Sequence, residues 1–131
     1  MKTQQVQVKD VAGLSAKLAT VSDAAQANLV LVFGAPSLLK ADTLFTQLKA
    51  ASPAAIIVGC STAGEITNAG IADDTLVVTL SQFDKVALSV ATTDLKNMDD
   101  SEDAGRRLGA GLQAAKPRAV LILGQGVNIN G

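Results

Sequence analysis

Residues 28–34, Asn28-Leu-Val-Leu-Val-Phe-Gly34, and residues 54–60, Ala54-Ala-Ile-Ile-Val-Gly-Cys60, decide the fold that this sequence predicts. Both runs are apolar almost throughout instead of alternating, which is typical of strands covered on both faces of a sheet. Between them, apolar residues recur at helical spacing over residues 38–48, behind Ser37 as an N-cap and before Pro53, which ends the helix. A strand, a helix and a second strand within about 30 residues form a βαβ unit.

The flanking segments add further helices and strands to this unit. Residues 10–26 carry apolar residues at steps of three and four behind Asp10, which predicts a first helix. Residues 75–81 and 85–91 are two short apolar runs with a three-residue connection, which predicts an antiparallel hairpin. A helix over residues 99–116 and a strand over residues 118–124 follow. We therefore expect an α/β fold: a mixed β-sheet with a βαβ unit and an antiparallel hairpin, and with helices packed on the sheet.

Composition indicates one domain over residues 1–131 and argues against several classes of partner. The 131 residues are 48% hydrophobic and 18% charged, which fits a single globular core. Eleven basic and twelve acidic side chains give a net charge of -1, so we expect neither a nucleic-acid nor a membrane partner. There is no His, Trp or Tyr. The commonest general base, metal ligand and haem ligand is therefore missing, and we expect no metal and no cofactor.

The single cysteine and the two ends of the chain lead to expectations about location and completeness. Cys60 has no partner for an internal disulfide, and the polar start Met1-Lys-Thr-Gln-Gln5 has no apolar signal-peptide core, so a cytoplasmic protein is expected. Residues 124–131 have the pattern of a strand-end loop that leads into another element. We therefore expect the chain to be the N-terminal half of a larger domain, truncated at its C-terminus, whose open sheet edge could self-associate.

The candidate site is the loop after the second strand of the βαβ unit, because ligands of open α/β sheets bind beyond the carboxyl ends of strands. Its members, all small or polar, are Cys60, Ser61, Thr62, Gly64 and Glu65. A ligand carboxylate would suit the Ser61 and Thr62 hydroxyls and the loop N–H groups, and an ammonium would suit Glu65. The alternative is a tight turn in which both hydroxyls cap local backbone and Glu65 is solvated.

A second loop follows the last predicted strand and would lie at the same end of the sheet. It contributes Gly126, Asn128 and Asn130 as ligand-binding candidates. An enzymatic alternative is a small hydrolase or transferase with Cys60 or Ser61 as the nucleophile and a base from the missing half. Gly59-Cys-Ser-Thr-Ala63 has Ala where the nucleophile-elbow motif has its last Gly. A third alternative is a protein-interaction domain that binds its partner through a sheet edge or its helices.

The segment Ile57-Val-Gly-Cys-Ser-Thr-Ala-Gly-Glu-Ile66 resembles the N-terminal part of the FIST domain, and residues 29–33, 75–78 and 120–124 occur in the same order as in that family. The resemblance implies a non-enzymatic sensory input domain of an intracellular signal-transduction protein. It also implies an amino acid or related small polar metabolite as ligand, and a chemotaxis or histidine-kinase output partner. Some members are haem-based nitric oxide sensors. Because this chain has no His, that alternative requires a haem ligand from the missing half.

Overall fold

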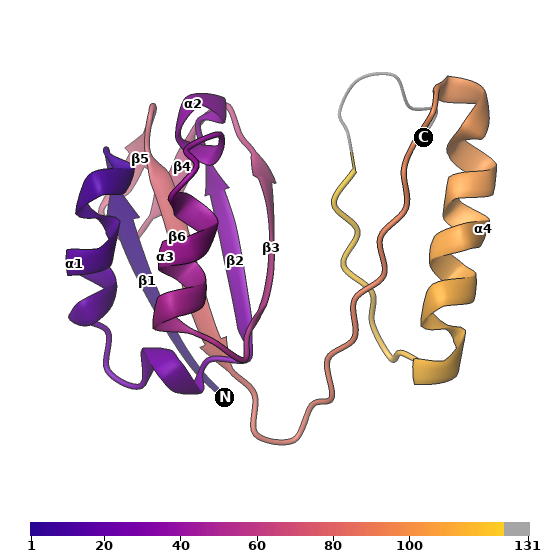
Figure 1. Cartoon of the computed structure of the whole chain (residues 1–131), viewed down its shortest axis with the longest axis horizontal. Coiled ribbons are helices and arrows are strands. Elements are labelled where there is room, and N and C mark those ends of the chain that lie inside the picture. Colours follow the sequence, from indigo (N-terminus) through magenta and orange to yellow (C-terminus); the bar gives the residue numbers. More distant parts are fainter. Residues whose placement is uncertain (125–131) are drawn as a thin grey trace. The chain divides into compact units, whose positions relative to one another are not determined.

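The structure is a computed structural model that describes residues 1–124 (Figure 1). Its contacts divide the chain into two compact units, Met1–Leu88 and Ser89–Gly131, and each unit is described by itself below. The expected single domain over residues 1–131 stays a prediction.

The first unit is built on a four-stranded mixed sheet with the order β1-β6-β2-β3. Its strands are β1 (Lys2–Val8), β2 (Leu29–Gly34), β3 (Ile56–Ser61) and β6 (Leu76–Gln82). The β2 and β3 strands are parallel, whereas β6 runs antiparallel to both β1 and β2. This mixed sheet, with helices packed on it, confirms the expected α/β fold class.

The predicted βαβ unit is confirmed, with its helical segment divided in two. α2 (Pro36–Leu39) and α3 (Leu44–Ala51) connect β2 to β3. The predicted first helix is also shorter than residues 10–26. α1 (Leu14–Ala19) lies between 3-10 turns at Val11–Gly13 and Ala24–Gln26, and Asp23 with φ 61° interrupts the helical path.

In Figure 1, α1 and α3 cover one face of the sheet, and the apolar core lies between these helices and that face. Leu14 and Leu18 of α1 and Leu48 of α3 are at most 3% exposed, and Val30, Leu76 and Val78 face them from the sheet at 0%. Full burial of one such side chain contributes roughly 1.5–3 kcal/mol. The helices therefore fix the sheet from one side and hold the ends of its strands in place.

The other sheet face carries side chains that join β1 to β6. The Gln5 amide donates to the Thr79 hydroxyl at 3.2 Å, and the Gln7 amide donates to the Thr75 hydroxyl at 3.1 Å. The Thr3 and Ser81 hydroxyls are 3.2 Å apart. The sequence did not predict β1, because the first four residues of this strand are polar. Only Val6 and Val8 add to the apolar core on the helix side.

The hairpin predicted from residues 75–81 and 85–91 is wrong in its pairing. Residues 85–91 form no strand, and β6 pairs with β1 on one side and with β2 on the other. Both edges of β6 are occupied, so residues 85–91 have no edge of β6 on which to pair. The antiparallel hairpin that does form is shorter and earlier, between β4 (Glu65–Thr67) and β5 (Gly70–Ala72).

The second unit is described over residues 89–124 and contains one long helix. α4 (Ser101–Leu112) lies between 3-10 turns at Met98–Asp100 and Gln113–Ala115, which confirms the helix predicted over residues 99–116. The strand predicted over residues 118–124 is absent from this described segment, and Val120, Leu121 and Ile122 are more than half exposed. Without a neighbouring strand to share a ladder, a run of β-forming residues is not a strand.

Candidate functional site

The candidate loop begins where the parallel strands β2 and β3 end together. The Thr62 N–H donates to the Gly34 carbonyl at 3.1 Å, so the first residue after β3 stays beside the last residue of β2. A Cβ at Gly34 would lie 2.6 Å from the Thr75 carbonyl oxygen. The end of β2 and the start of β6 therefore approach too closely for a side chain, and the predicted position at the carboxyl ends of the strands is where the structure places this loop.

Glu65 is the buried acid of the loop. It opens β4, is 3% exposed, and accepts hydrogen bonds on both carboxylate oxygens. Thr62 Oγ1 donates to Oε1 at 2.6 Å, while Thr75 Oγ1 and the Thr75 N–H donate to Oε2 at 2.6 and 3.2 Å. The Thr62 hydroxyl and then the Thr75 hydroxyl lower the pKa of Glu65 below its ordinary value of 4.5, and they outweigh the burial, which raises it. Glu65 is therefore a buried, charged and fully hydrogen-bonded side chain.

The hydrogen bonds of Glu65 continue into β1. The Thr75 hydroxyl that donates to Glu65 accepts in turn from Gln7 Nε2 at 3.1 Å. One chain of hydrogen bonds thus connects β1, the start of β6 and the loop after β3. The alternative of a turn with a solvated Glu65 is wrong, because the carboxylate is buried and Thr62 donates to it. Sequence reasoning missed Thr75 and Gln7, which lie ten and 58 positions away from Glu65.

Three hydrogen-bond donors of the loop have no acceptor within the described residues. The Ser61 side chain is exposed and makes no hydrogen bond in this part of the chain. The N–H groups of Ala63 and Gly64 likewise have no acceptor in residues 1–124. The Asp73 carboxylate lies against the same loop, 3.0 Å from the position that a Cβ on Gly64 would take, and its residue is exposed. The loop therefore presents three donors and one neighbouring carboxylate.

Cys60 lies on β3 beside Phe33 of β2, and its thiol is free and half-buried. The chain contains no histidine, and the nearby Glu65 carboxylate is occupied by its threonine donors. Neither a histidine nor Glu65 is therefore available as a general base for Cys60 or Ser61. The other ligand-binding candidates, Gly126, Asn128 and Asn130, lie outside the described residues.

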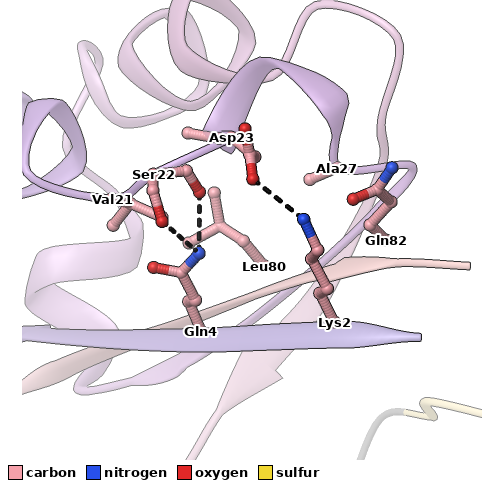
Figure 2. Close-up of a pocket in the computed structure, with 9 residues that line it drawn as sticks. Lys2, Gln4, Val21, Ser22, Asp23, Ala27, Leu80 and Gln82 are labelled. Carbon is pink, nitrogen blue, oxygen red and sulfur yellow. Dashed lines mark hydrogen bonds and ion pairs between the residues drawn. The ribbon is translucent and has the colours of Figure 1, made fainter.

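Two hollows in the first unit lie away from this loop. The smaller, shown in Figure 2, has a volume of about 10 Å³, which is enough for about one water molecule. Lys2 Nζ and Asp23 Oδ2 form an ion pair at 3.1 Å across it, and Gln4 Nε2 donates to the Ser22 carbonyl at 2.7 Å. The larger, a groove of about 420 Å³, is lined mainly by α1, α3 and residues 21–25. Neither hollow includes a residue of the candidate loop.

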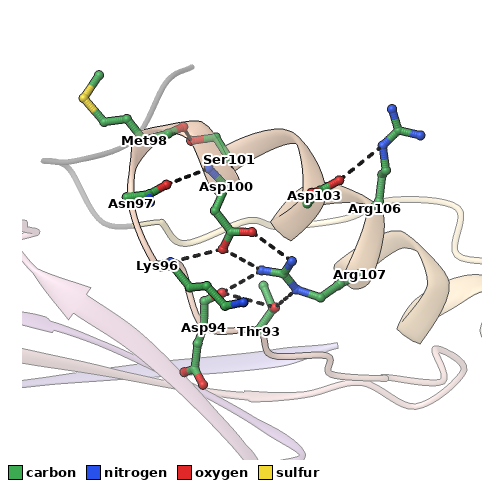
Figure 3. A network of polar contacts seen from close by, with 10 residues as sticks. All are labelled: Thr93, Asp94, Lys96, Asn97, Met98, Asp100, Ser101, Asp103, Arg106 and Arg107. Atoms are coloured by element: carbon green, nitrogen blue, oxygen red, sulfur yellow. Dashed lines mark hydrogen bonds and ion pairs between the residues drawn. The ribbon is translucent and has the colours of Figure 1, made fainter.

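A polar network that the sequence did not reveal organises the second unit (Figure 3). The Arg107 guanidinium donates to Thr93 Oγ1 at 2.8 Å and to the Asp94 carbonyl at 2.9 Å, and it forms two hydrogen bonds with the Asp100 carboxylate. The bonds from Arg107 to the Asp100 carboxylate, followed by one from the Lys96 N–H, lower the pKa of Asp100 from 3.8 to about 2. Arg107, although exposed, fixes residues 93–97 against the start of α4.

The described residues contain neither a metal-binding cluster nor a membrane-spanning helix. In residues 1–124, no three Asp, Glu or Cys side chains are grouped as a metal ion would require. No helix in this part of the chain has both the length and the apolar character needed to cross a membrane.

The fold and the loop together define an α/β domain with its candidate site at the carboxyl ends of parallel strands. The model of the FIST N domain family matches residues 28–131, which is most of the chain. The chain therefore belongs to the FIST N domain family, a family of sensory domains in signal transduction. The resemblance noted at residues 57–66 is confirmed. No curated protein and no solved structure matches the chain.

Proposed function

We propose that this domain is a non-enzymatic, cytoplasmic input domain that binds an amino acid or a related small polar metabolite and reports its occupancy to a signalling output partner. The family assignment supports the sensory role. The proposed ligand class is supported by three donors without acceptors that lie beside a carboxylate. The donors are the Ser61 hydroxyl and the N–H groups of Ala63 and Gly64, and the carboxylate is that of Asp73.

These groups match the two charged ends of an amino acid. A ligand carboxylate would accept from the Ser61 hydroxyl and the two N–H groups, and charge-assisted bonds of this kind are each worth roughly 1.5–3 kcal/mol. The ligand ammonium would pair with Asp73 instead of Glu65, because the Glu65 oxygens already accept from Thr62 and Thr75. In this proposal Glu65 positions the loop and does not touch the ligand.

The same loop offers a route from ligand to output. The loop connects β3 to the β4–β5 hairpin. Glu65 is the first residue of that hairpin, and its carboxylate accepts a hydrogen bond from Thr75, which directly precedes β6. A ligand held by residues 61–64 would therefore pull on the hairpin without disturbing the buried sheet. The exposed Ile66 and Ile71, which face each other in that hairpin, would carry the change to a partner surface.

The first prediction is a ligand-dependent rise in melting temperature. A panel of amino acids added to the purified chain should contain at least one that stabilises it by about 2.7 kcal/mol at 100 times its Kd. Thermal unfolding followed by circular dichroism measures this shift. Blocking the ammonium by N-acetylation, or the carboxylate by amidation, should each remove it, because each modification deletes one of the two charged ends.

Variants assign the effect to the loop. Ser61→Ala and Asp73→Asn should abolish the ligand-dependent shift, with circular dichroism of the free variants used to confirm that they fold. Asp74→Asn is the matched control, since Asp74 is the exposed neighbouring acid and its φ of 53° is one that Asn tolerates. A folded protein whose melting temperature no amino acid raises would contradict the proposal.

A further inference from the structure

The outer edge of β3 has no strand beside it within the first unit. β3 is the last strand of the order β1-β6-β2-β3, and among the residues that the structure describes it pairs with β2 alone. The Ile56 and Thr62 N–H groups donate to the carbonyls of Asn28, just before β2, and of Gly34, its last residue. By the alternation of a strand, the N–H and C=O groups of Ile57, Gly59 and Ser61 therefore turn outward. The strand contains no charged residue, no Pro and no bulge, the usual devices that keep strand edges apart. The opposite edge, β1, starts with Lys2 and is rich in Gln.

We propose that this edge pairs with the same edge of a second copy of the chain, antiparallel and centred on Gly59, to form a symmetric dimer with a continuous sheet. In this register the outward groups of Ile57 meet those of Ser61 in the second copy, and Gly59 meets Gly59. Gly59 is exposed, and a Cβ there would collide with the Val32 carbonyl on the β2 side. The centre of the edge is therefore bare backbone, on which a second copy can approach closely.

Charge at the two ends of the edge favours a second copy in this orientation. Lys49 Nζ donates to the Ala55 carbonyl at 2.8 Å, which puts a positive charge at the start of the edge. Asp73 lies beside Gly64, which puts a negative charge just beyond its end. The register centred on Gly59 sets Ala55 opposite Ala63 of the second copy. Each Lys49 thus comes close to the Asp73 of the other copy, and the pairing is complementary at both ends.

Cross-linking tests both the dimer and its register. Val58 and Cys60 of the second copy form a non-hydrogen-bonded pair, whose Cα atoms lie about 4.5 Å apart, within disulfide range. Val58→Cys should therefore give a covalent dimer on oxidation with glutathione disulfide. Within one chain, positions 58 and 60 are about 6.6 Å apart with their Cα–Cβ bonds parallel, which is too far for the Cβ separation of about 3.8 Å that a disulfide needs.

The controls are the wild-type chain and Val58→Cys/Cys60→Ser. Each has one cysteine, which in the proposed register lies diagonally across the strand pair from the cysteine of the second copy and not opposite it, so both should stay uncrosslinked. Light scattering of the wild-type chain should give a mass that rises with concentration to twice that of one chain. Lys49→Glu should shift this rise to higher concentration, and Lys49→Glu/Asp73→Lys should restore it, with circular dichroism used to confirm folding.

Three results would overturn the proposal. One is a wild-type chain that stays monomeric at every concentration. Another is cross-linking of the wild type or of Val58→Cys/Cys60→Ser equal to that of Val58→Cys, which would indicate a different register or random collision. The third is a monomer in which the Ile57 and Gly59 amides are protected from hydrogen exchange, which would show that a strand of the same molecule covers the edge.

Discussion

At the residue scale, Glu65 shows how a polar side chain can hold a loop from within. Its carboxylate receives three hydrogen bonds from Thr62 and Thr75, and it is removed from solvent. An isolated buried charge would be costly, but three donors replace the water that it loses. The loop after β3 is therefore shaped by an internal anion, and the groups left for a ligand are those that do not face Glu65.

The second prediction concerns the cost of removing this anion. Glu65→Ala leaves the Thr75 N–H and hydroxyl without an acceptor, so we expect the free energy of unfolding at neutral pH to fall by about 3 kcal/mol. Glu65→Gln should cost roughly half as much, because its Oε1 can accept from Thr75 while its amide donates to Thr62. Urea unfolding followed by circular dichroism measures both changes.

The chain offers a matched control for this prediction in its other glutamate. Glu102 lies on the exposed face of α4 in an ion pair with Arg106, and Glu102→Ala should change stability by less than about 0.5 kcal/mol. Equal losses for Glu65→Ala and Glu102→Ala would show that burial and hydrogen bonding at Glu65 do not matter to stability.

Sequence reasoning found part of this site because that part is local. Ser61, Thr62 and Glu65 lie within five positions, directly after an apolar strand, so their convergence follows from chain order alone. Thr75 and Gln7 could not be found in this way, because Thr75 reaches Glu65 only after the chain has passed through the β4–β5 hairpin. Gln7 in turn meets Thr75 only through the pairing of β1 with β6. Asp73 lies nine positions after Gly64, and the fold of the β4–β5 hairpin places it beside that residue.

At the scale of elements, the two strands that the sequence predicted best are those with continuous apolar runs. β2 and β3 have few polar residues, and no other element competes for their positions. The errors arise where a strand's identity depends on its neighbours. β1 is polar, and it is a strand because it pairs with one edge of β6. Residues 85–91 have a strand-like composition, but both edges of β6 are already paired, so these residues have no edge of that strand to join.

The third prediction tests the network that joins residues 93–97 to α4. Arg107→Lys replaces a planar fork of donors with a single ammonium, which cannot serve Thr93, Asp94 and Asp100 together. We expect the Lys96 amide, which donates to Asp100 at 3.1 Å, to exchange its hydrogen several-fold faster. Hydrogen exchange followed by NMR measures this rate.

The adjacent arginine provides the comparison for this experiment. Arg106 is 71% exposed, and within residues 1–124 its ion-pair partners are Glu102 and Asp103 of its own helix. Arg106→Lys should leave the Lys96 exchange rate unchanged. If both substitutions accelerate exchange equally, helix stability and not the Arg107 network controls residues 93–97.

At the scale of the whole molecule, each unit contains one carboxylate whose pKa is lowered by hydrogen bonds. Glu65 lies in the first unit with a pKa below 4.5, and Asp100 lies in the second with a pKa of about 2. A carboxylate with a lowered pKa in the folded state stabilises that state at pH values above its unfolded pKa. The contribution is lost as pH falls through the folded pKa. Both units should therefore lose stability in acid for the same physical reason.

The last prediction is the pH range of this loss and its separate origin in each unit. From pH 7 to about 5 these two groups should leave stability unchanged, since 4.5 and 3.8 are their ordinary pKa values. Between about pH 4.5 and pH 2 the amides of β6 and of α4 should both lose protection, as hydrogen exchange corrected for its intrinsic pH dependence will show. Glu65→Gln should flatten this pH dependence in β6 alone, and Asp100→Asn should flatten it in α4 alone, because each removes the titrating group of one unit. Protection that rises as pH falls from 5 to 3 would mean that the two carboxylates are protonated more readily in the folded chain than in the unfolded one, contrary to their hydrogen bonds.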